Sequence, residues 1–144
     1  MAARRDATVT DSVKRVLSGP PIPGLVSAYI FGSVAEHRSH RDSDLDIGLL
    51  LDRGAYPDER TRFEAQVELR RHLSPATVGR EVDVVVLNDA SPVLAQQIIA
   101  SGERVICFDA EADHAFRRDV QLRAADLQPF LSRMRRLLLA NLIR

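Results

Sequence analysis

The chain has 144 residues, the size of one domain with a single hydrophobic core. Its 45% hydrophobic and 28% charged residues are ordinary for a soluble globular protein, and its net charge of zero argues against direct binding to nucleic acid. No apolar run approaches the length of a membrane span, the N-terminus has no apolar signal core, and the single cysteine excludes an internal disulfide. We therefore expect a cytoplasmic protein that does not bind membranes, with Cys107 as an inert core residue.

Helices and strands alternate along the first three quarters of the chain. Apolar residues at three- and four-residue spacing indicate helices, short apolar runs indicate strands, and prolines and glycines mark the boundaries. The expected elements, in chain order, are a helix over about residues 10–18, strands over 25–31 and 45–51, a helix over 58–73, a strand over 82–87, a helix from 92 to 102 and a strand over 104–108. Ser33 is also placed to cap a short helix that begins directly after Gly32. This order indicates an α/β (α+β) domain with a mixed sheet of about four strands flanked by helices.

Two of these helices have a broad apolar face, which we expect to pack against the sheet. The apolar face of the helix over residues 58–73 consists of Phe63, Val67, Leu69 and Leu73. The apolar face of the helix that begins at residue 92 consists of Leu94, Ile98 and Ile99.

The C-terminal part of the chain differs in character. Apolar residues recur there in a heptad-like stripe, formed by Val120, Ala124, Leu127, Leu131, Met134 and Leu138. Pro129 interrupts the stripe, so we expect either a kink or a second helix that begins there. Residues 137–143 are apolar nearly all round and need more cover than one face of a small sheet supplies. We expect a domain over residues 1–112 and a helical segment over 113–144 that is part of the same domain and binds a partner, giving a hetero- or homo-oligomer.

The most informative stretch of the sequence carries two aspartates. A Gly-Ser pair, Gly32 and Ser33, follows one expected strand, and Asp44 and Asp46 stand at the start of the next. Residues two apart on a strand face the same way, so both carboxylates project together. Two converging carboxylates repel one another unless a divalent cation lies between them. The alternative is a pair of solvated turn aspartates, which do not usually lead into so apolar a strand.

A third aspartate stands inside a later apolar run. Asp83 alternates with Val82 and Val84, so it faces away from those valines. An unpaired charge buried in such a strand costs several kcal/mol. Asp83 therefore either joins the same site or pairs with a core arginine, for which Arg80 and Arg104 are the candidates.

The order strand, Gly-Ser, ten residues, Asp-x-Asp, strand resembles the signature of the polymerase-beta-like nucleotidyltransferases, specifically their minimal (MNT) branch. The resemblance covers about residues 24–108. It implies the fold of that superfamily, here with a C-terminal helical extension, and it implies that Asp83 is the third carboxylate of the site. The chain departs from the family pattern at Glu36 and His37, where a basic residue followed by glycine is common.

This resemblance implies nucleotidyl transfer from ATP with two magnesium ions. Two metal ions stabilise the attacking and leaving oxygens of such a reaction, and magnesium prefers carboxylates, phosphate oxygens and water. Asp44 and Asp46 would bridge the two ions, and Asp83 would hold the metal beneath the incoming hydroxyl and take up its proton. Gly32 would let the triphosphate approach the backbone, and Ser33 would donate hydrogen bonds to the phosphates.

Stand-alone proteins of this size in the resembled family are typically antitoxins paired with a helical HEPN ribonuclease. The resemblance implies that the chain transfers AMP to a tyrosine hydroxyl of that toxin and so neutralises it. Two other functions stay open, namely transfer to a small molecule such as an aminoglycoside, and a non-catalytic antitoxin that acts by binding. Similarly, His37, His40 and Arg41 either contact phosphate or nucleotide or belong to a solvated loop.

Overall fold

The fold is built on one mixed sheet. The computed structural model describes residues 2–19, 22–36, 39, 44–77 and 79–143. Its elements are α1 (Ala2–Ser18), β1 (Leu25–Phe31), β2 (Leu45–Leu51), α2 (Glu59–Leu73), η1 (Ser74–Ala76), β3 (Val82–Val86), η2 (Leu87–Asp89), α3 (Pro92–Ser101), β4 (Glu103–Cys107) and α4 (Ala110–Ile143). The strand order is β3-β2-β1-β4; β1 is antiparallel to β2 and β4, and β2 is parallel to β3. The expected α/β (α+β) architecture with four strands is confirmed.

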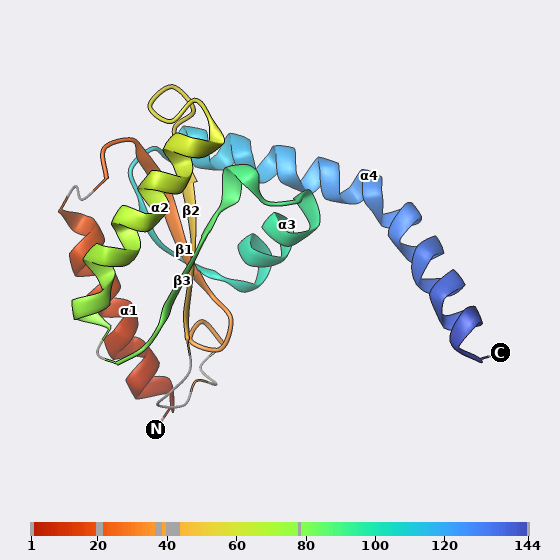
Figure 1. Ribbon diagram of the computed structural model, residues 1–144, viewed down its shortest axis with the longest axis horizontal. Coiled ribbons are helices and arrows are strands. Elements are labelled where there is room, and N and C mark those ends of the chain that lie inside the picture. The colour runs from red at the N-terminus through yellow and green to blue at the C-terminus, as the bar shows by residue number, and fades with distance from the viewer. Residues whose placement is uncertain (1, 20–21, 37–38, 40–43, 78, 144) are drawn as a thin grey trace.

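Helices cover both faces of the sheet (Figure 1). On one face, α1 and α2 contribute buried residues such as Val13 and Leu69 to the larger hydrophobic core. On the other face, α3 and the first half of α4 contribute residues such as Ile98 and Val120 to a second core. The sheet is therefore the middle layer of three, and each face of a strand meets a different pair of helices.

Side chains of β2 alternate between the two cores, as its sequence predicts. Leu45, Ile47 and Leu49 have no exposed surface and lie in the core beneath α1 and α2. Leu50 lies in the core on the α3 side, which is also the side to which Asp46 projects. The expectation that Asp46 faces away from its apolar neighbours is confirmed.

Helix α1 begins at Ala2, well before the expected start near Thr10. Four of its residues are buried along one face, namely Asp6, Thr10, Val13 and Leu17. These residues recur at helical spacing, but the first two are polar. The spacing of apolar residues therefore did not predict the first half of the helix, because its buried residues there are polar.

Helix α2 has the expected extent and is capped by Asp58, but part of its inner face differs from the prediction. Phe63 and Val67, expected to be buried, are 60% and 47% exposed. Arg62 is buried instead. Its Nε lies 2.9 Å from a carboxylate oxygen of Asp89, and its Nη1 donates to the carbonyl oxygen of Tyr56 at 2.9 Å. These bonds compensate the burial of its charge, which apolar periodicity does not reveal.

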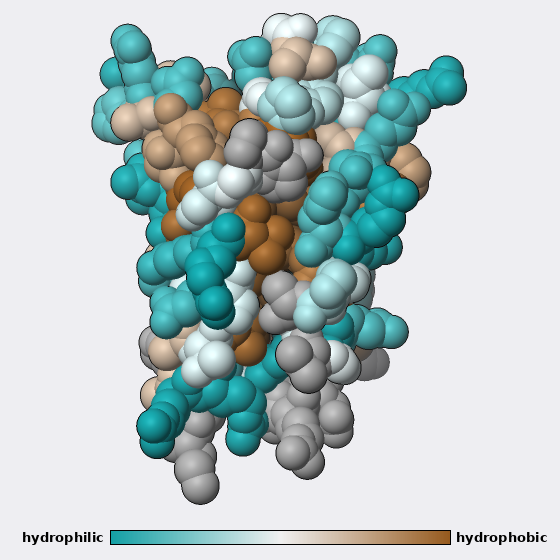
Figure 2. Space-filling view, turned by 90° about the vertical axis from the view of Figure 1, so that its left-hand side faces the viewer, coloured by the Kyte–Doolittle hydropathy of each residue, from teal (hydrophilic) through white to brown (hydrophobic). Residues whose placement is uncertain are grey.

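The surface formed by α1 and α2 is seen in Figure 2. Hydrophilic side chains cover most of this side of the molecule, and a strip of hydrophobic side chains is visible between them. At one edge of the sheet, β4 ends at Cys107, which is a free thiol and is partly exposed rather than fully in the core.

Helix α4 is continuous through Pro129, so the alternative of a second helix beginning there is wrong. The helix bends in its second half and projects from the body of the molecule (Figure 1). Proline lacks an amide hydrogen and crowds the preceding turn, which is the usual cause of such a bend. Large apolar residues are exposed along the projecting part, namely Leu127, Phe130, Leu131, Met134, Leu137, Leu138, Leu139 and Leu142. None of the helices in the described ranges combines the length and apolarity that crossing a membrane requires.

Candidate active site

Strand pairing brings the predicted site residues to one end of the sheet. Asp46 of β2 is paired in register with Phe31 at the end of β1 and with Asp83 of β3. Asp44 lies just before β2, and Gly32 follows Phe31 directly. Paired residues on neighbouring strands project to the same face, so Asp46 and Asp83 share one face beside Gly32.

The three carboxylates differ in exposure and influence one another. Asp44 and Asp83 are exposed, whereas Asp46 is half-buried. Burial raises the pKa of Asp46, and the negative charges of Asp83 and then Asp44 raise it further. The folded protein therefore disfavours the ionised form of Asp46.

The arginines considered as alternative partners of Asp83 have other acceptors. Arg104 donates from Nη1 to Asp113 Oδ2 at 2.9 Å. Arg80 Nη2 lies 4.0 Å from Asp6 Oδ1, on the far side of the sheet beneath α1. Because Asp83 is itself exposed, it does not need a buried counter-charge and is available to the site.

Gly32 is needed at its position for two reasons. Its φ of +76° lies in the left-handed region that favours glycine, and a Cβ atom there would overlap Asp46 Oδ2. Residues 32–36 form a single turn in which the Glu36 amide donates to the Gly32 carbonyl at 3.1 Å. The short helix expected after Gly32 is therefore absent from these five residues, because the left-handed residue turns the chain, and Ser33 lies partly exposed in the turn.

The donor set suits magnesium, although the side chains do not form a finished metal centre. Within the described part of the chain, no group of three His, Cys, Asp or Glu side chains is arranged so that it could hold a metal ion. Asp44, Asp46 and Asp83 are nevertheless hard oxygen donors at one end of the sheet, and their repulsion is what a divalent cation would neutralise. The predicted contacts of His37, His40 and Arg41 lie outside the described residues.

A pocket of about 250 Å³ lies beside Gly32. One wall consists of Phe31, Gly32 and Glu36, and α3 supplies the other with Leu94 and Gln97 among its residues. Leu94, expected to be buried, is 40% exposed and lines this pocket. Sequence reasoning missed Leu94 and Gln97 as site neighbours, because only the packing of α3 on the sheet decides which of its faces meets Gly32.

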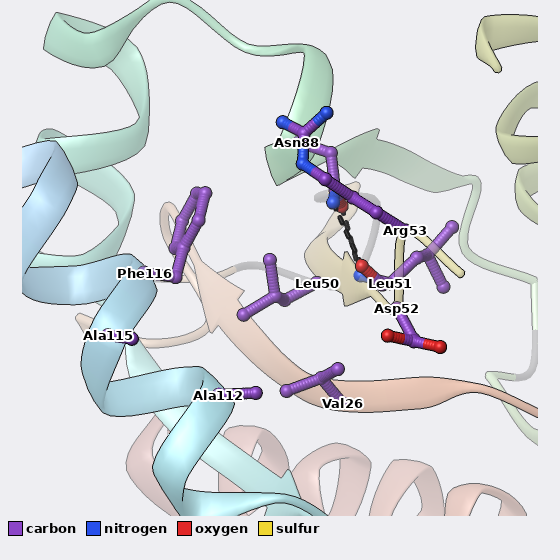
Figure 3. Close-up of a pocket in the computed structure, with 9 residues that line it drawn as sticks. All are labelled: Val26, Leu50, Leu51, Asp52, Arg53, Asn88, Ala112, Ala115 and Phe116. Atoms are coloured by element: carbon purple, nitrogen blue, oxygen red, sulfur yellow. Dashed lines mark hydrogen bonds between the residues drawn. The ribbon is translucent and has the colours of Figure 1, made fainter. Parts of the chain in front are cut away.

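A second pocket, of about 290 Å³, lies at the opposite end of β2 (Figure 3). Val26, Leu50 and Phe116 form its apolar side, and Asn88 borders it. The Asn88 side chain accepts from the Leu51 amide and donates to the Leu51 carbonyl, both at 2.9 Å, so it continues the hydrogen bonding of the strand. This pocket is separate from Asp44 and Asp46, which lie at the start of β2.

This chain is similar to known proteins both in sequence and in overall fold. Protein adenylyltransferase MntA of Shewanella oneidensis is 37% identical over 84 residues, which are 58% of this chain and 55% of that protein. The chain thus spans about half the length of this curated relative. A toxin-antitoxin crystal structure with AMP-PNP is similar over 94% of this chain and 98% of its own, with 26% identity and a TM-score of 0.63. A structure of a tri-AMPylated HEPN toxin of Shewanella oneidensis in complex with an MNT antitoxin is similar over 96% of this chain and 99% of its own. With 23% identity and a TM-score of 0.59, this similarity concerns the fold alone.

The family assignment rests on a match that includes the whole sheet. The family model of polymerase beta nucleotidyltransferases matches residues 14–111, which contain all four strands and Gly32, Asp44, Asp46 and Asp83. The chain therefore belongs to the polymerase beta nucleotidyltransferase family.

Proposed function

We propose that this chain is a magnesium-dependent protein adenylyltransferase that acts as an antitoxin. It transfers AMP from ATP to a hydroxyl, that of a tyrosine, on a HEPN-family ribonuclease toxin and thereby silences the toxin. The observation that carries the proposal is the meeting of three carboxylates with a left-handed glycine at one end of the sheet. The likeness to MntA supports a protein acceptor, and the likeness to a toxin-antitoxin bound to AMP-PNP supports ATP as substrate. The free thiol of Cys107 suits the cytoplasm as the compartment.

Each residue has a distinct role in this reaction. Asp44, Asp46 and Asp83 would hold two magnesium ions, which when bound supply positive charge to the phosphate oxygens. Gly32 has no side chain, which lets the triphosphate approach its backbone, and a Cβ atom there would also overlap Asp46 Oδ2. Ser33 donates hydrogen bonds from its hydroxyl and amide to the phosphates, as groups in such turns do.

The acceptor hydroxyl attacks the α-phosphorus of ATP. A bond forms between the tyrosine oxygen and that phosphorus while the bond from phosphorus to the bridging oxygen breaks, and pyrophosphate leaves. Asp83 orients the hydroxyl and takes up its proton. Its exposure places it where an acceptor from another molecule can reach it.

The test is a transfer assay with ATP labelled at the α-phosphate. The full chain is incubated with labelled ATP and magnesium, with and without the protein encoded in the neighbouring reading frame. We expect label on the partner protein only when both proteins and magnesium are present, and a mass increase of whole AMP units. Absence of label on the partner under all conditions would show that the proposed acceptor is wrong.

A matched pair of variants ties the label to the site. Asp44→Asn removes one metal-binding carboxylate at the start of β2, and Asp52→Asn changes an exposed aspartate beyond the end of the same strand. We expect Asp44→Asn to lower transfer by about 100-fold or more, the scale of losing a group that stabilises transition-state charge. Asp52→Asn should transfer at the parental rate, since Asn can still accept the hydrogen bond from the Ala55 amide.

A further inference from the structure

A buried polar cluster surrounds Ser39, which stands between Ser33 and Asp44 in the sequence. Asp6 of α1 has no exposed surface, and Ser39 of the loop is 3% exposed. The Ser39 hydroxyl donates to Asp6 Oδ1, and Arg80 Nη2 lies 3.4 Å from the same hydroxyl oxygen. Arg5 approaches from α1 as well, with its Nη1 at 3.4 Å from the Ser39 carbonyl oxygen. Three polar side chains, two from α1 and one from just before β3, thus converge on Ser39.

The position of Ser39 connects this cluster to the candidate active site. In the sequence, Ser39 stands between Ser33 of the proposed phosphate-binding turn and Asp44, the first aspartate of the site. Arg80 lies just before β3, the strand that carries Asp83. In Figure 1 the start of α1 lies at the same end of the molecule as the turn after β1. The cluster therefore contains Ser39, which stands between Ser33 and Asp44 in the sequence, and Arg80, which lies shortly before Asp83.

Burying the carboxylate of Asp6 costs free energy unless partners compensate its charge. A carboxylate removed from water needs hydrogen bonds and a counter-charge, which Ser39 and Arg80 supply to Asp6 Oδ1. The other oxygen, Oδ2, has no hydrogen-bond partner among the described residues. A valine or leucine at position 6 would fill the inner face of α1 without this cost, but it could not hold a loop through a directional bond.

We propose that Asp6 and Arg80 are positioning residues that act through Ser39, which stands between Ser33 and Asp44 in the sequence. They hold Ser39 in place so that Gly32 and Ser33 keep their position relative to the aspartates when ATP binds. This inference rests on the proposed function of the site. Its ligand is the triphosphate of ATP, and its prediction concerns ATP affinity rather than the identity of the acceptor.

The chain offers a matched control for the loss of one buried serine. Ser27 of β1 is fully buried and donates to a buried carboxylate oxygen of Asp113 at 2.6 Å, on the α4 side of the sheet and away from the loop. Ser27→Ala and Ser39→Ala each remove one hydroxyl that bonds a buried aspartate. A merely structural role for Ser39 predicts that the two variants behave alike.

The experiment compares the two variants as full chains with the partner protein. Melting temperature is measured for each, and KM for ATP and kcat are measured separately. We expect both variants to melt at lower temperature than the parent. Only Ser39→Ala should raise KM for ATP, by about tenfold, with kcat within about twofold, since a misplaced binding group costs affinity for the substrate. An equal KM in the two variants would overturn the proposal and leave the transferase function intact.

A second measurement does not depend on catalysis. Hydrogen exchange of the amides of residues 33–36 is followed in the parent and in both variants. Faster exchange in Ser39→Ala than in Ser27→Ala supports the positioning role even if the parent protein transfers no AMP, a result that would defeat the proposed function alone. Equal exchange rates in the two variants would show that the cluster does not hold the turn.

Discussion

At the scale of single residues, Asp46 is the site carboxylate whose pKa the fold raises. Its raised pKa means that the folded protein binds this proton more tightly than the unfolded chain, so ionised Asp46 destabilises the fold at neutral pH. The penalty disappears as pH falls through the raised pKa. Asp46→Asn should therefore raise the melting temperature of the metal-free protein by a few degrees, on the order expected for about 1 kcal/mol or less, and should abolish AMP transfer. Calorimetric melts at neutral pH and the transfer assay check both outcomes.

The control for Asp46 is again Asp52→Asn, which lies beyond the other end of β2. It should change neither the melting temperature nor the transfer rate by a measurable amount. A destabilised Asp46→Asn variant, or one that transfers at close to the parental rate, would contradict the assignment of Asp46 to a metal-binding carboxylate group.

Gly32 allows a sharper test, because Gly79 has nearly the same backbone conformation in an open position. Their φ values are +76° and +75°, but a Cβ would overlap Asp46 Oδ2 at Gly32, whereas at Gly79 it would meet no other atom of the described residues within 4 Å. Alanine at either position should cost about 1–2 kcal/mol of stability for the left-handed conformation. Only Gly32→Ala should also weaken ATP binding, measured by calorimetry. Unchanged ATP affinity in Gly32→Ala would exclude the phosphate-binding role.

At the scale of elements, one buried aspartate joins α4 to the sheet by hydrogen bonds, beside the apolar packing of the second core. Asp113 accepts at Oδ1 from the hydroxyls of Ser27 and Tyr29, both at 2.6 Å, and at Oδ2 from Arg104 at 2.9 Å. Burial alone would raise the pKa of Asp113, but these three hydrogen bonds outweigh it and lower the pKa. Asp113→Ala should lower the free energy of unfolding by about 2–4 kcal/mol, because it leaves buried donors without partners. Asp119→Ala, an exposed residue of the same helix, should cost no more than about 0.5 kcal/mol.

The lowered pKa also fixes the sign of the pH dependence. The stabilisation by Asp113 is fully present above the ordinary aspartate pKa of about 3.9 and is lost as pH falls through the lowered value in the folded protein. Denaturant unfolding of parent and Asp113→Ala at neutral and strongly acidic pH checks this, and the difference between them should shrink in acid. A difference that stays constant would mean that the aspartate contributes through packing rather than charge.

At the scale of the whole molecule, the projecting part of α4 stands apart from the three-layer body. Every described residue from 128 to 142 is exposed, whereas Val120, nearer the body, is buried. An apolar surface of this kind is typical of a protein interface, and we predict that it binds the acceptor protein. A chain truncated after Gln128 should remain folded, bind ATP with parental affinity and lose transfer to the partner. Melting curves, calorimetry and the transfer assay measure the three properties.

Unfolding or aggregation of the truncated chain would show that the segment belongs to the core. The double substitution Leu137→Asp with Leu138→Asp keeps the length of the helix and removes apolar surface from it. It should also lose transfer while retaining the parental melting temperature, and normal transfer by this variant would place the acceptor elsewhere on the molecule.

Much of the fold and the site follows from local patterns in the sequence. The two-residue period of β2 correctly separates Asp46 from Leu45 and Ile47, and the spacing from Gly32 to Asp44 indicates the family that the comparisons bear out. These features are predictable because neighbouring residues alone determine which face of a strand a side chain occupies. The metal-binding and phosphate-binding roles of these residues remain predictions.

Tertiary structure alone decided which distant residues meet. Asp6 and Ser39 form a buried hydrogen bond, and Arg62 rather than Phe63 lies on the buried face of α2. The partners of these polar groups come from other segments of the chain. Sequence periodicity treats a charged residue as exposed, since burying it is unfavourable until a partner is present. The order of the strands and the packing of the helices supply those partners. They determined the pocket beside Gly32 and the buried contacts of Asp6 in α1 with Ser39.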